Sequence, residues 1–188
     1  MKYFFDTEFI EDGKTIDLIS IGISCEDGRD LYLISNEFDE SKASEWVKVN
    51  VLDKINKSDG VSRRVIKGKI IDFVADSNPE FWAYYADYDW IVLCQIFGRM
   101  IDLPDGWPMY CRDLKQLCDD LGNPKLPNNN NNHHALDDAN WCRIAYNFLM
   151  EEKRYDICYG KYGAYFYDCI RGNDLNLYQV KHLLNRKS

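Results

Sequence analysis

Two acidic residues near the start of the sequence have the spacing of a metal-binding pair. Asp6 and Glu8 flank Thr7 in an aromatic-rich run, KYFFDTEF at 2–9, which has the composition of a strand. Side chains alternate along a strand, so Asp6 and Glu8 share one face, about 7 Å apart. Acids on a solvated sheet face are the plain structural explanation. The aromatic neighbours instead favour a central strand, where unpaired carboxylates are costly, so we expect this pair to hold metal ions.

A second acidic position lies in the segment ADYDWIVLCQIFG. Asp89 heads the apolar stripe of a helix expected over 87–97, whose other members are Val92, Leu93, Ile96 and Phe97. A lone acid in the first turn is more often a partner of the helix dipole than a ligand. Asp87 fits the N-cap of the same helix better. Of the two acids, Asp89 is therefore the candidate for a site in the interior.

The third group of chemistry-bearing residues is HHALDDA at 133–139. On a helix, Asp138 borders the apolar stripe that runs through Ala139 and Cys142, whereas Asp137 points away from it. Asp138 is therefore expected to reach the interior. A histidine beside it could act as a base, since the imidazole pKa lies near neutrality. A pair of exposed loop histidines is the alternative explanation.

These residues must be positioned by the elements around them. Asp12-Gly13 and Asp27-Gly28 separate three apolar runs, at 2–9, 15–24 and 30–35, which predicts an antiparallel three-strand meander. Further strands are expected at 81–85 and 109–112. Helices are expected over 41–55, 64–75, 87–97, 113–121 and 136–152. A meander followed by alternating helices and strands predicts an α/β protein with a mixed sheet and helices on both faces.

Composition limits the classes of function. The 188 residues, 46% of them hydrophobic, favour one domain over 1–152, with 153–188 as a C-terminal extension packed on it. The net charge of −8 argues against a broad basic surface that coats nucleic acid, but bound dications would reverse the charge locally. Seven cysteines without a CxxC pair predict free thiols in a reducing compartment. With neither signal peptide nor membrane span apparent, we expect a cytoplasmic protein with no membrane partner.

The combination of motifs is more specific than any one of them. DTEF at 6–9, YADYD at 85–89 and HHALDDA at 133–139 together resemble the DEDDh family of 3′→5′ exonucleases, over roughly residues 1–150. The opening, YFFDTEFIEDGKTIDLISIG, is most similar to a small bacterial and phage branch of exoribonucleases. The resemblance implies a ribonuclease H-like fold with a five-strand mixed sheet. Two departures are the extra acid Asp87 and the five asparagines at 128–132, for which we expect a mobile loop.

The resemblance also implies a mechanism. Asp6, Glu8, Asp89 and Asp138 would hold two Mg²⁺ ions, or Mn²⁺, with Asp6 bridging both ions. Glu8 and Asp138 would complete the site beside the attacking water, and Asp89 would hold the second ion. The family's general base stands five residues before the last aspartate, which selects His133 over His134. Products would be nucleoside 5′-monophosphates.

The expected substrate is single-stranded RNA in preference to DNA, gripped by stacking on side chains beside the carboxylate pair. Phe9 and Ile10 are the candidates for the terminal nucleotide, with backbone contacts from Thr7; core packing is the alternative for Phe9. Relatives of this type often form homodimers, so a homodimer is expected. A DNA or short-oligonucleotide nuclease, a non-catalytic binding module on the same fold and a carboxylate-rich metal buffer are the competing hypotheses.

Overall fold

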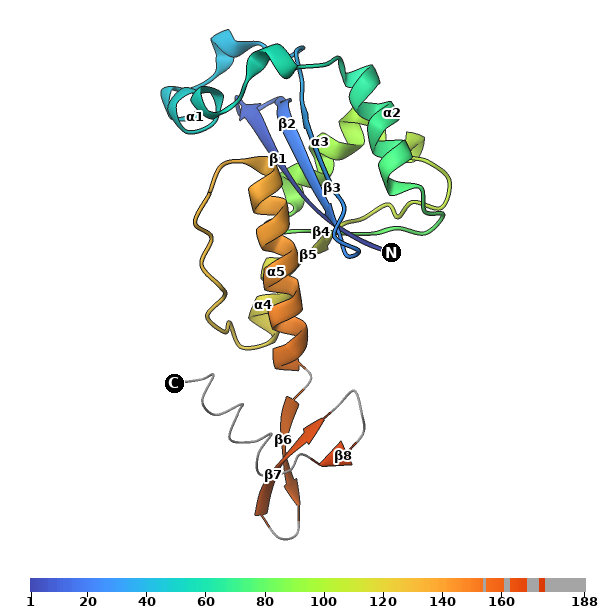
Figure 1. Cartoon of the computed structure of the whole chain (residues 1–188), viewed down its shortest axis with the longest axis vertical. Helices are drawn as coiled ribbons and strands as arrows, with labels where there is room; N and C mark the ends of the chain where they lie inside the picture. Colours follow the sequence, from blue (N-terminus) through green and yellow to red (C-terminus); the bar gives the residue numbers. More distant parts are fainter. Residues whose placement is uncertain (154, 161–162, 169–172, 175–188) are drawn as a thin grey trace.

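A five-stranded mixed sheet lies at the centre of the protein. The computed structural model describes residues 1–153, 155–160, 163–168 and 173–174. The strand order is β3-β2-β1-β4-β5, which makes β1 the central strand (Figure 1). The strands are β1 (Lys2–Glu11), β2 (Ile16–Cys25), β3 (Asp30–Ile34), β4 (Glu80–Ala83) and β5 (Arg112–Asp113). The five strands and their mixed directions agree with the prediction, although β5 begins later than the expected 109–112.

The first three strands form the predicted antiparallel meander. Gly13 and Gly28 occupy its two turns with φ angles of 80° and 92°, which glycine adopts without a steric penalty. β1 and β2 pair along nearly their whole lengths, with one irregularity between Glu8 and Phe9. This long pairing holds the acidic segment of β1 in a fixed register.

Helices cover both faces of the sheet. β4 runs parallel to β1, and β5 runs parallel to β4, so each needs a crossover connection. The helices are α1 (Glu45–Asn50), α2 (Arg63–Val74), α3 (Asp87–Phe97), α4 (Leu114–Asp120) and α5 (Ala135–Lys153). α2 and α3 pack on one face of the sheet, and α4 and α5 pack on the other (Figure 1). The predicted two-sided α/β arrangement is confirmed.

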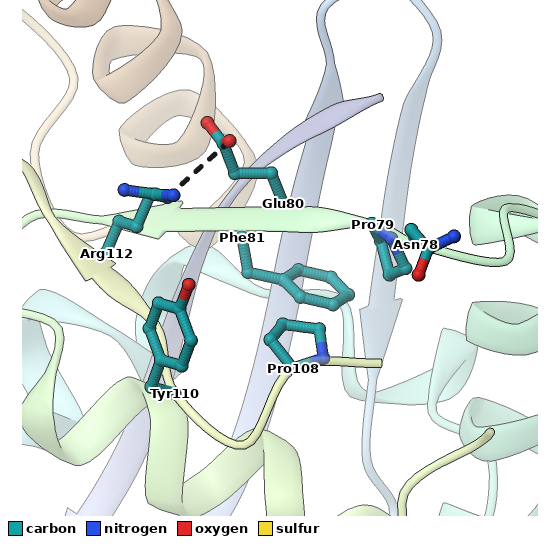
Figure 2. Close-up of a pocket in the computed structure, with 7 residues that line it drawn as sticks. All are labelled: Asn78, Pro79, Glu80, Phe81, Pro108, Tyr110 and Arg112. Carbon is teal, nitrogen blue, oxygen red and sulfur yellow. Dashed lines mark ion pairs between the residues drawn. The ribbon is translucent and has the colours of Figure 1, made fainter. Parts of the chain in front are cut away.

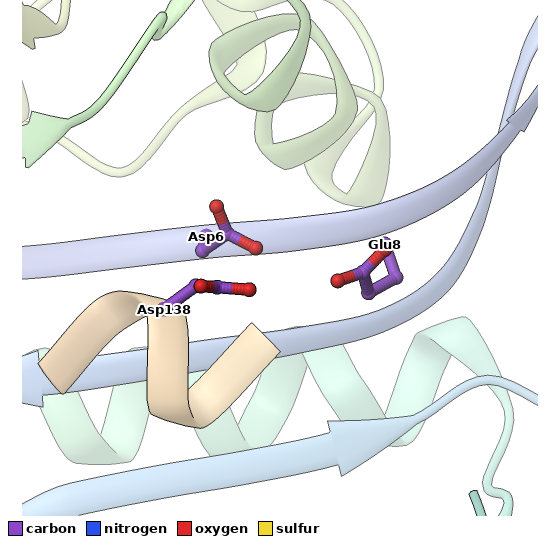
Figure 3. A group of neighbouring side chains, drawn as sticks. All are labelled: Asp6, Glu8 and Asp138. Carbon is purple, nitrogen blue, oxygen red and sulfur yellow. The ribbon is translucent and has the colours of Figure 1, made fainter. Parts of the chain in front are cut away.

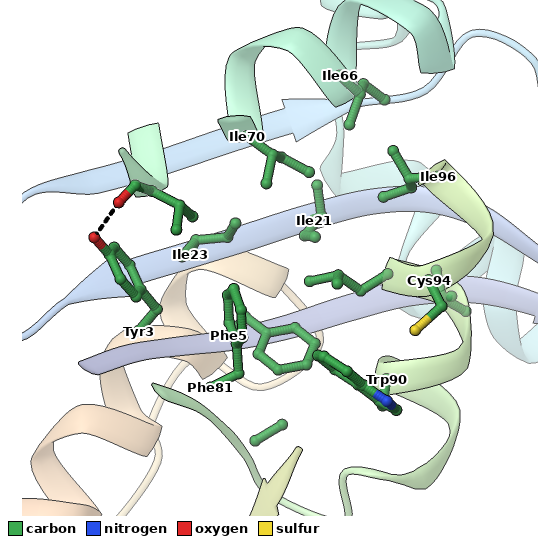
Figure 4. Close-up of a cluster of buried hydrophobic side chains, with 14 of the residues drawn as sticks. Tyr3, Phe5, Ile21, Ile23, Ile66, Ile70, Phe81, Trp90, Cys94 and Ile96 are labelled. Carbon is green, nitrogen blue, oxygen red and sulfur yellow. Dashed lines mark hydrogen bonds between the residues drawn. The ribbon is translucent and has the colours of Figure 1, made fainter. Parts of the chain in front are cut away.

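Alternation along β1 divides its side chains between two cores. Phe5 belongs to the cluster under α2 and α3, where it is fully buried (Figure 4). Phe4 points the other way and packs in the cluster that contains Leu149 of α5. The same alternation sends Asp6 towards α5 and Thr7 towards α3. β1 can therefore offer a carboxylate to one helix and a hydroxyl to another.

The prediction of a single helix over 41–55 is wrong. α1 begins where the Ser44 hydroxyl accepts the Val47 N–H at 3.2 Å, and it ends at Val51, whose φ of −120° and ψ of −61° are not helical. Short 3₁₀ turns lie at Glu40–Lys42, Leu52–Lys54, Lys57–Asp59 and Met100–Asp102. The N-cap residue Ser44 lies within the segment that shows helical spacing of apolar residues, so the segment is divided into shorter elements. The other four helices lie within one residue of their expected bounds.

The chain beyond α5 contains a second, smaller sheet. Among its described residues, β6 (Tyr155–Gly160), β7 (Gly163–Asp168) and β8 (Asn173–Asp174) pair antiparallel in the order β6-β7-β8. Packing of the segment 153–188 on the first domain stays a prediction, and residues 175–188 lie outside the described residues.

Within the part of the chain that the structure describes, no helix combines the length and apolar character needed to cross a bilayer. Its cysteines at 25, 94, 111, 118 and 142 carry free thiols, as predicted.

Candidate active site

The predicted carboxylate pair faces the start of α5. Asp6 and Glu8 lie on β1, and Asp138 lies in the first turn of α5. One carboxylate oxygen from each of the three lies within 4.8 Å of the other two. Figure 3 shows the three side chains converging from the strand and the helix. The structure thus brings together three of the acids that the sequence selected.

A glycine on the neighbouring strand allows α5 to approach. Gly22 of β2 stands directly opposite Asp6 in the β1–β2 pairing. A Cβ atom at Gly22 would overlap the backbone of Ala135 and Leu136 at the start of α5. Sequence reasoning missed this residue. A glycine inside a strand often marks the close approach of another backbone, and that signal could have found it.

The fourth acid, Asp89, enters from the opposite side of β1. It lies in the first turn of α3 and is buried, whereas Asp87 is exposed. Thr7 donates two hydrogen bonds to Asp89 Oδ1, from its backbone N–H at 2.8 Å and from its hydroxyl at 2.6 Å. The choice of Asp89 over Asp87 as the interior acid therefore agrees with the structure.

The expectation that Asp87 caps α3 is wrong. The N-cap position belongs to Ala86, and Asp87 is the first helical residue. The Ala86 N–H is bonded by Asp113 Oδ2 at 3.0 Å, an acid from β5. A side chain of β5 therefore accepts the hydrogen bond from the backbone of the turn that leads into α3.

Burial and mutual repulsion disfavour the ionised form of these carboxyl groups when no cation is bound beside them. Burial, followed by the neighbouring carboxylates, raises the pKa of Asp6 well above its ordinary value. Burial raises the pKa of Glu8 to about 8, helped by Asp138 and Asp89. Lys54 lowers the pKa of Glu8, but it does not offset the other causes. Burial raises the pKa of Asp89 to about 6, against the hydrogen bonds from Thr7.

This donor set fits divalent cations. All the ligand groups are carboxylate oxygens, which suit hard ions such as Mg²⁺ or Mn²⁺. Like charges held this close in a buried pocket need positive charge beside them to stay ionised. The convergence of oxygens and the raised pKa values are the two observations that support a metal-binding site here.

The two adjacent histidines have different surroundings. His133 has a φ of 68°, and its backbone N–H bonds to Asp138 Oδ2 at 2.8 Å. Its ring lies edge-on to Trp46 of α1, with the centroids 4.7 Å apart, and it lines the cleft over the carboxylates. The His134 ring packs on Tyr32 at 4.5 Å. Only His133, of these two, lines the cleft, which supports its selection as the base.

The asparagine run is part of the site. Asn129 donates its side-chain amide to Asp138 Oδ1, and Asn129 and Asn132 line the cleft. The Asn132 carbonyl accepts a hydrogen bond from Lys54 Nζ at 2.9 Å. The loop therefore does more than lengthen the connection to α5: it supplies a hydrogen bond to a candidate metal ligand.

The cleft consists of two adjoining cavities, of about 510 Å³ and 310 Å³. Both are lined by Asp6, Tyr84, Tyr85, His133 and Asp138. The larger also includes Asn129, Asn132, Trp141 and Cys142, and the smaller includes Thr7, Glu8, Phe9, Tyr88 and Asp89. Both volumes lie in the range of small-molecule sites, about 300–1,000 Å³.

The expected substrate-binding residues separate into two groups. Thr7 and Phe9 line the smaller cavity, and the Phe9 ring packs edge-on against Tyr88 at 5.8 Å. Ile10 is 3% exposed and packs in a different apolar cluster, with Ile19 and Val51, so it does not line the described cleft. Sequence reasoning missed the tyrosines 84, 85 and 88, although YYADY stands in the motif that supplied Asp89.

Comparison with known proteins finds one matching family and two similar proteins in Mycobacterium tuberculosis. The sequence model of one protein family, described as the 3′-5′ exoribonuclease Rv2179c-like domain, matches residues 1–150. Two curated Mycobacterium tuberculosis proteins, 3′-5′ exoribonuclease Rv2179c (strain ATCC 25618 / H37Rv) and 3′-5′ exoribonuclease MT2234.1 (strain CDC 1551 / Oshkosh), are each 43% identical to this chain over 146 residues. These matches cover 74% of this chain and 87% of each relative.

Solved structures show the same fold at low sequence identity. Escherichia coli exonuclease I in complex with a dT13 oligonucleotide superposes with a TM-score of 0.60 at 11% identity, over 81% of this chain. The zinc-bound exonuclease I–ssDNA complex gives 0.57 at 13% identity, also over 81%. The chain spans only 41% and 40% of those two proteins. The likeness confirms the ribonuclease H-like α/β fold.

Proposed function

The chain belongs to the family of 3′-5′ exoribonucleases with Rv2179c-like domains, and from that membership we propose that it removes nucleotides one at a time from the 3′ end of single-stranded RNA. The observation that carries the proposal is the convergence of Asp6, Glu8 and Asp138 within 4.8 Å. Oxygen-rich sites of this kind suit the metal-assisted hydrolysis of phosphodiesters.

Four carboxylates would hold two Mg²⁺ or Mn²⁺ ions. Asp6, Glu8 and Asp138 form one group, and Asp89 approaches from α3 beside Thr7. When bound, such ions lower the pKa of a water molecule and neutralise charge on the departing 3′ oxygen. Asp6, Glu8, Asp138 and Asp89 are the residues that would hold these ions in place.

His133 is the proposed general base. His133 lines both cavities, and its backbone N–H donates a hydrogen bond to Asp138 Oδ2 at 2.8 Å, which keeps the residue beside the carboxylates. There it would accept the proton of the attacking water at a ring nitrogen. The products are nucleoside 5′-monophosphates, because attack on the last phosphorus leaves that phosphate on the released nucleotide.

Single-stranded RNA is the proposed partner. The curated relatives are named exoribonucleases, and the exonuclease I structures hold single-stranded DNA. The digestion rates of matched RNA and DNA oligonucleotides of one sequence would establish the preference. If DNA is digested faster, DNA and not RNA is the substrate. A homodimer is our further expectation, and light scattering of the purified protein would test it.

The decisive experiment uses neighbouring acids as a matched pair. A 5′-labelled oligoribonucleotide is incubated with the protein and Mg²⁺, with and without chelator. We expect stepwise shortening from the 3′ end that chelator, Asp6→Asn and Asp138→Asn all abolish. Asp137→Asn, one residue away and outside the carboxylate group, should retain activity. Binding without shortening in the native protein would favour the non-catalytic module instead.

A further inference from the structure

The turn between β4 and α3 presents an aromatic ring to the cleft. Tyr85 lies in this turn with a φ of 57°, a left-handed conformation that few non-glycine residues adopt. It is 63% exposed, so the hydrophobic core does not account for an aromatic residue at this position. Strained backbone of this kind concentrates at functional sites, where the surrounding structure must hold it in place.

The surrounding structure holds this turn from two sides. Asp113 accepts the Ala86 N–H at 3.0 Å through one oxygen and caps α4 through the other, where Lys115 N–H lies at 2.6 Å. The Tyr84 ring packs edge-on against Tyr85 at 4.7 Å and against Trp141 of α5 at 5.0 Å. A row of three rings, Trp141–Tyr84–Tyr85, therefore leads from α5 to the cleft.

Tyr85 also stands at the boundary between the two cavities. Like Asp6 and Asp138, it lines both of them. A phosphate bound at the carboxylate group would sit at the same boundary. The two nucleotides that this phosphate joins would then occupy one cavity each. The ring of Tyr85 is placed to contact a base beside the scissile bond.

The two cavities offer different contacts to these nucleotides. The smaller, of about 310 Å³, has its own aromatic pair in Phe9 and Tyr88, which suits the terminal nucleotide that leaves. Tyr84 and Tyr85 line both cavities, but Trp141, the other end of the row, lines only the larger, of about 510 Å³, which has room for the chain that continues. The row is therefore left for the base of the next nucleotide.

We propose that Tyr85 is a stacking platform for the base of the penultimate nucleotide, on the 5′ side of the scissile phosphate. This inference rests on the proposed exonuclease function and adds a specific subsite to it. Stacking on a tyrosine face recognises any base, because every base has a π-face. The subsite would hold single-stranded ends without selecting a sequence, and a paired base would have to unstack to reach it.

The test removes the ring without changing the backbone strain. Tyr85→Asn suits this purpose, because asparagine tolerates the left-handed conformation. Tyr85→Phe keeps the ring and removes only the hydroxyl. The matched control is Tyr110→Asn, because Tyr110 is 58% exposed but lines a separate cavity of about 140 Å³ beside Glu80 and Arg112 (Figure 2).

Two quantities are measured for each variant: the KM for nucleotide release in Mg²⁺, and the Kd for a labelled oligoribonucleotide in Ca²⁺, which coordinates oxygen more loosely. We expect Tyr85→Asn to raise both by about tenfold, the effect of one lost base–aromatic stack. Tyr85→Phe and Tyr110→Asn should stay near the native values. Unchanged KM and Kd in Tyr85→Asn would overturn the assignment.

Oligonucleotides that lack one base locate the contact. With an abasic penultimate nucleotide, native protein and Tyr85→Asn should bind equally well. With an abasic terminal nucleotide, the tenfold difference should persist, and its disappearance there would overturn the choice of the penultimate base. Native protein that binds but never releases nucleotides would refute the proposed function, while the Kd comparison would still decide the role of Tyr85.

Discussion

Thr7 donates both its backbone N–H and its hydroxyl to the same oxygen of Asp89, at 2.8 Å and 2.6 Å. The two residues belong to different elements, and Thr7 stands between the metal-ligand candidates Asp6 and Glu8 on β1. One strand therefore supplies two acids to one side and fixes a third acid on the other. The relationship makes Thr7 a positioning residue of the site.

Thr7→Val should move the activity profile to higher pH. The hydrogen bonds from Thr7 lower the pKa of Asp89, which burial has raised to about 6. Without the hydroxyl, that pKa rises further, so more of Asp89 is protonated in mildly acidic solution. We expect roughly tenfold lower activity at pH 6, the effect of one hydrogen bond to a charged group, with partial recovery at pH 8. Thr7→Ser should behave like the native protein, and a uniform loss at every pH would contradict this role.

Without metal, the folded protein should become less stable as the pH rises from about 4 to 8. The pKa values of Glu8 and Asp89, about 8 and 6, exceed their ordinary values of 4.5 and 3.8. The folded state therefore binds more protons than the unfolded state in this window, and the free energy of unfolding falls as the pH increases.

Thermal unfolding in chelator at pH 5 and pH 8 measures this dependence. Added Mg²⁺ should raise the Tm more at pH 8, because cations bind the deprotonated carboxylates. Glu8→Gln should flatten the pH dependence in chelator. An equal slope in the variant and the native protein would remove Glu8 as its source.

Gly22→Ala should reduce activity although it replaces none of the acidic residues. Its methyl group would overlap the backbone at Ala135 and Leu136, so the start of α5 must shift and carry Asp138 away from Asp6. A displacement of about 1 Å at a catalytic group can lower the rate about a hundredfold. Gly68→Ala is the matched control, because a Cβ atom there meets nothing within 4 Å and alanine favours the helix. Similar kcat/KM values for both variants would show that this close approach is unnecessary.

His133→Ala should lose far more activity than His134→Ala. General bases contribute about 10²–10⁴-fold to a rate, and only His133, of the two, lines the described cleft. The His134 ring packs on Tyr32, so its removal should lower the Tm rather than kcat. Single-turnover rates of both variants, at matched Mg²⁺, give the comparison, and equal losses would contradict the assignment of His133.

The sequence predicted what depends on local periodicity. Alternation in DTEF placed Asp6 and Glu8 on one face, and helical stripes selected Asp89 and Asp138 over Asp87 and Asp137. These patterns follow from backbone geometry, which is the same in any fold. The meander followed from the two Asp-Gly turns, which need positive φ angles.

What the sequence could not predict depends on contacts between distant segments. Nothing local marks Tyr85 as left-handed, because its turn is held by Asp113 from another strand. The same turn makes Ala86 the N-cap of α3, so Asp87 is the first helical residue and not the cap. Ile10 was expected at the substrate but faces the cluster of Ile19 and Val51, a contact that appears only once the α1 region has packed.

The late position of Asp138 has a consequence during synthesis. The strand that carries Asp6 and Glu8 leaves the ribosome early, but α5 leaves it only after most of the domain has been made. A chain made only as far as α4 therefore carries Asp6, Glu8 and Asp89 but lacks both Asp138 and His133. Only when α5 docks across Gly22 do Asp138 and His133 join the acids of β1 and α3, so the order of the segments along the chain keeps the site incomplete until α5 has folded.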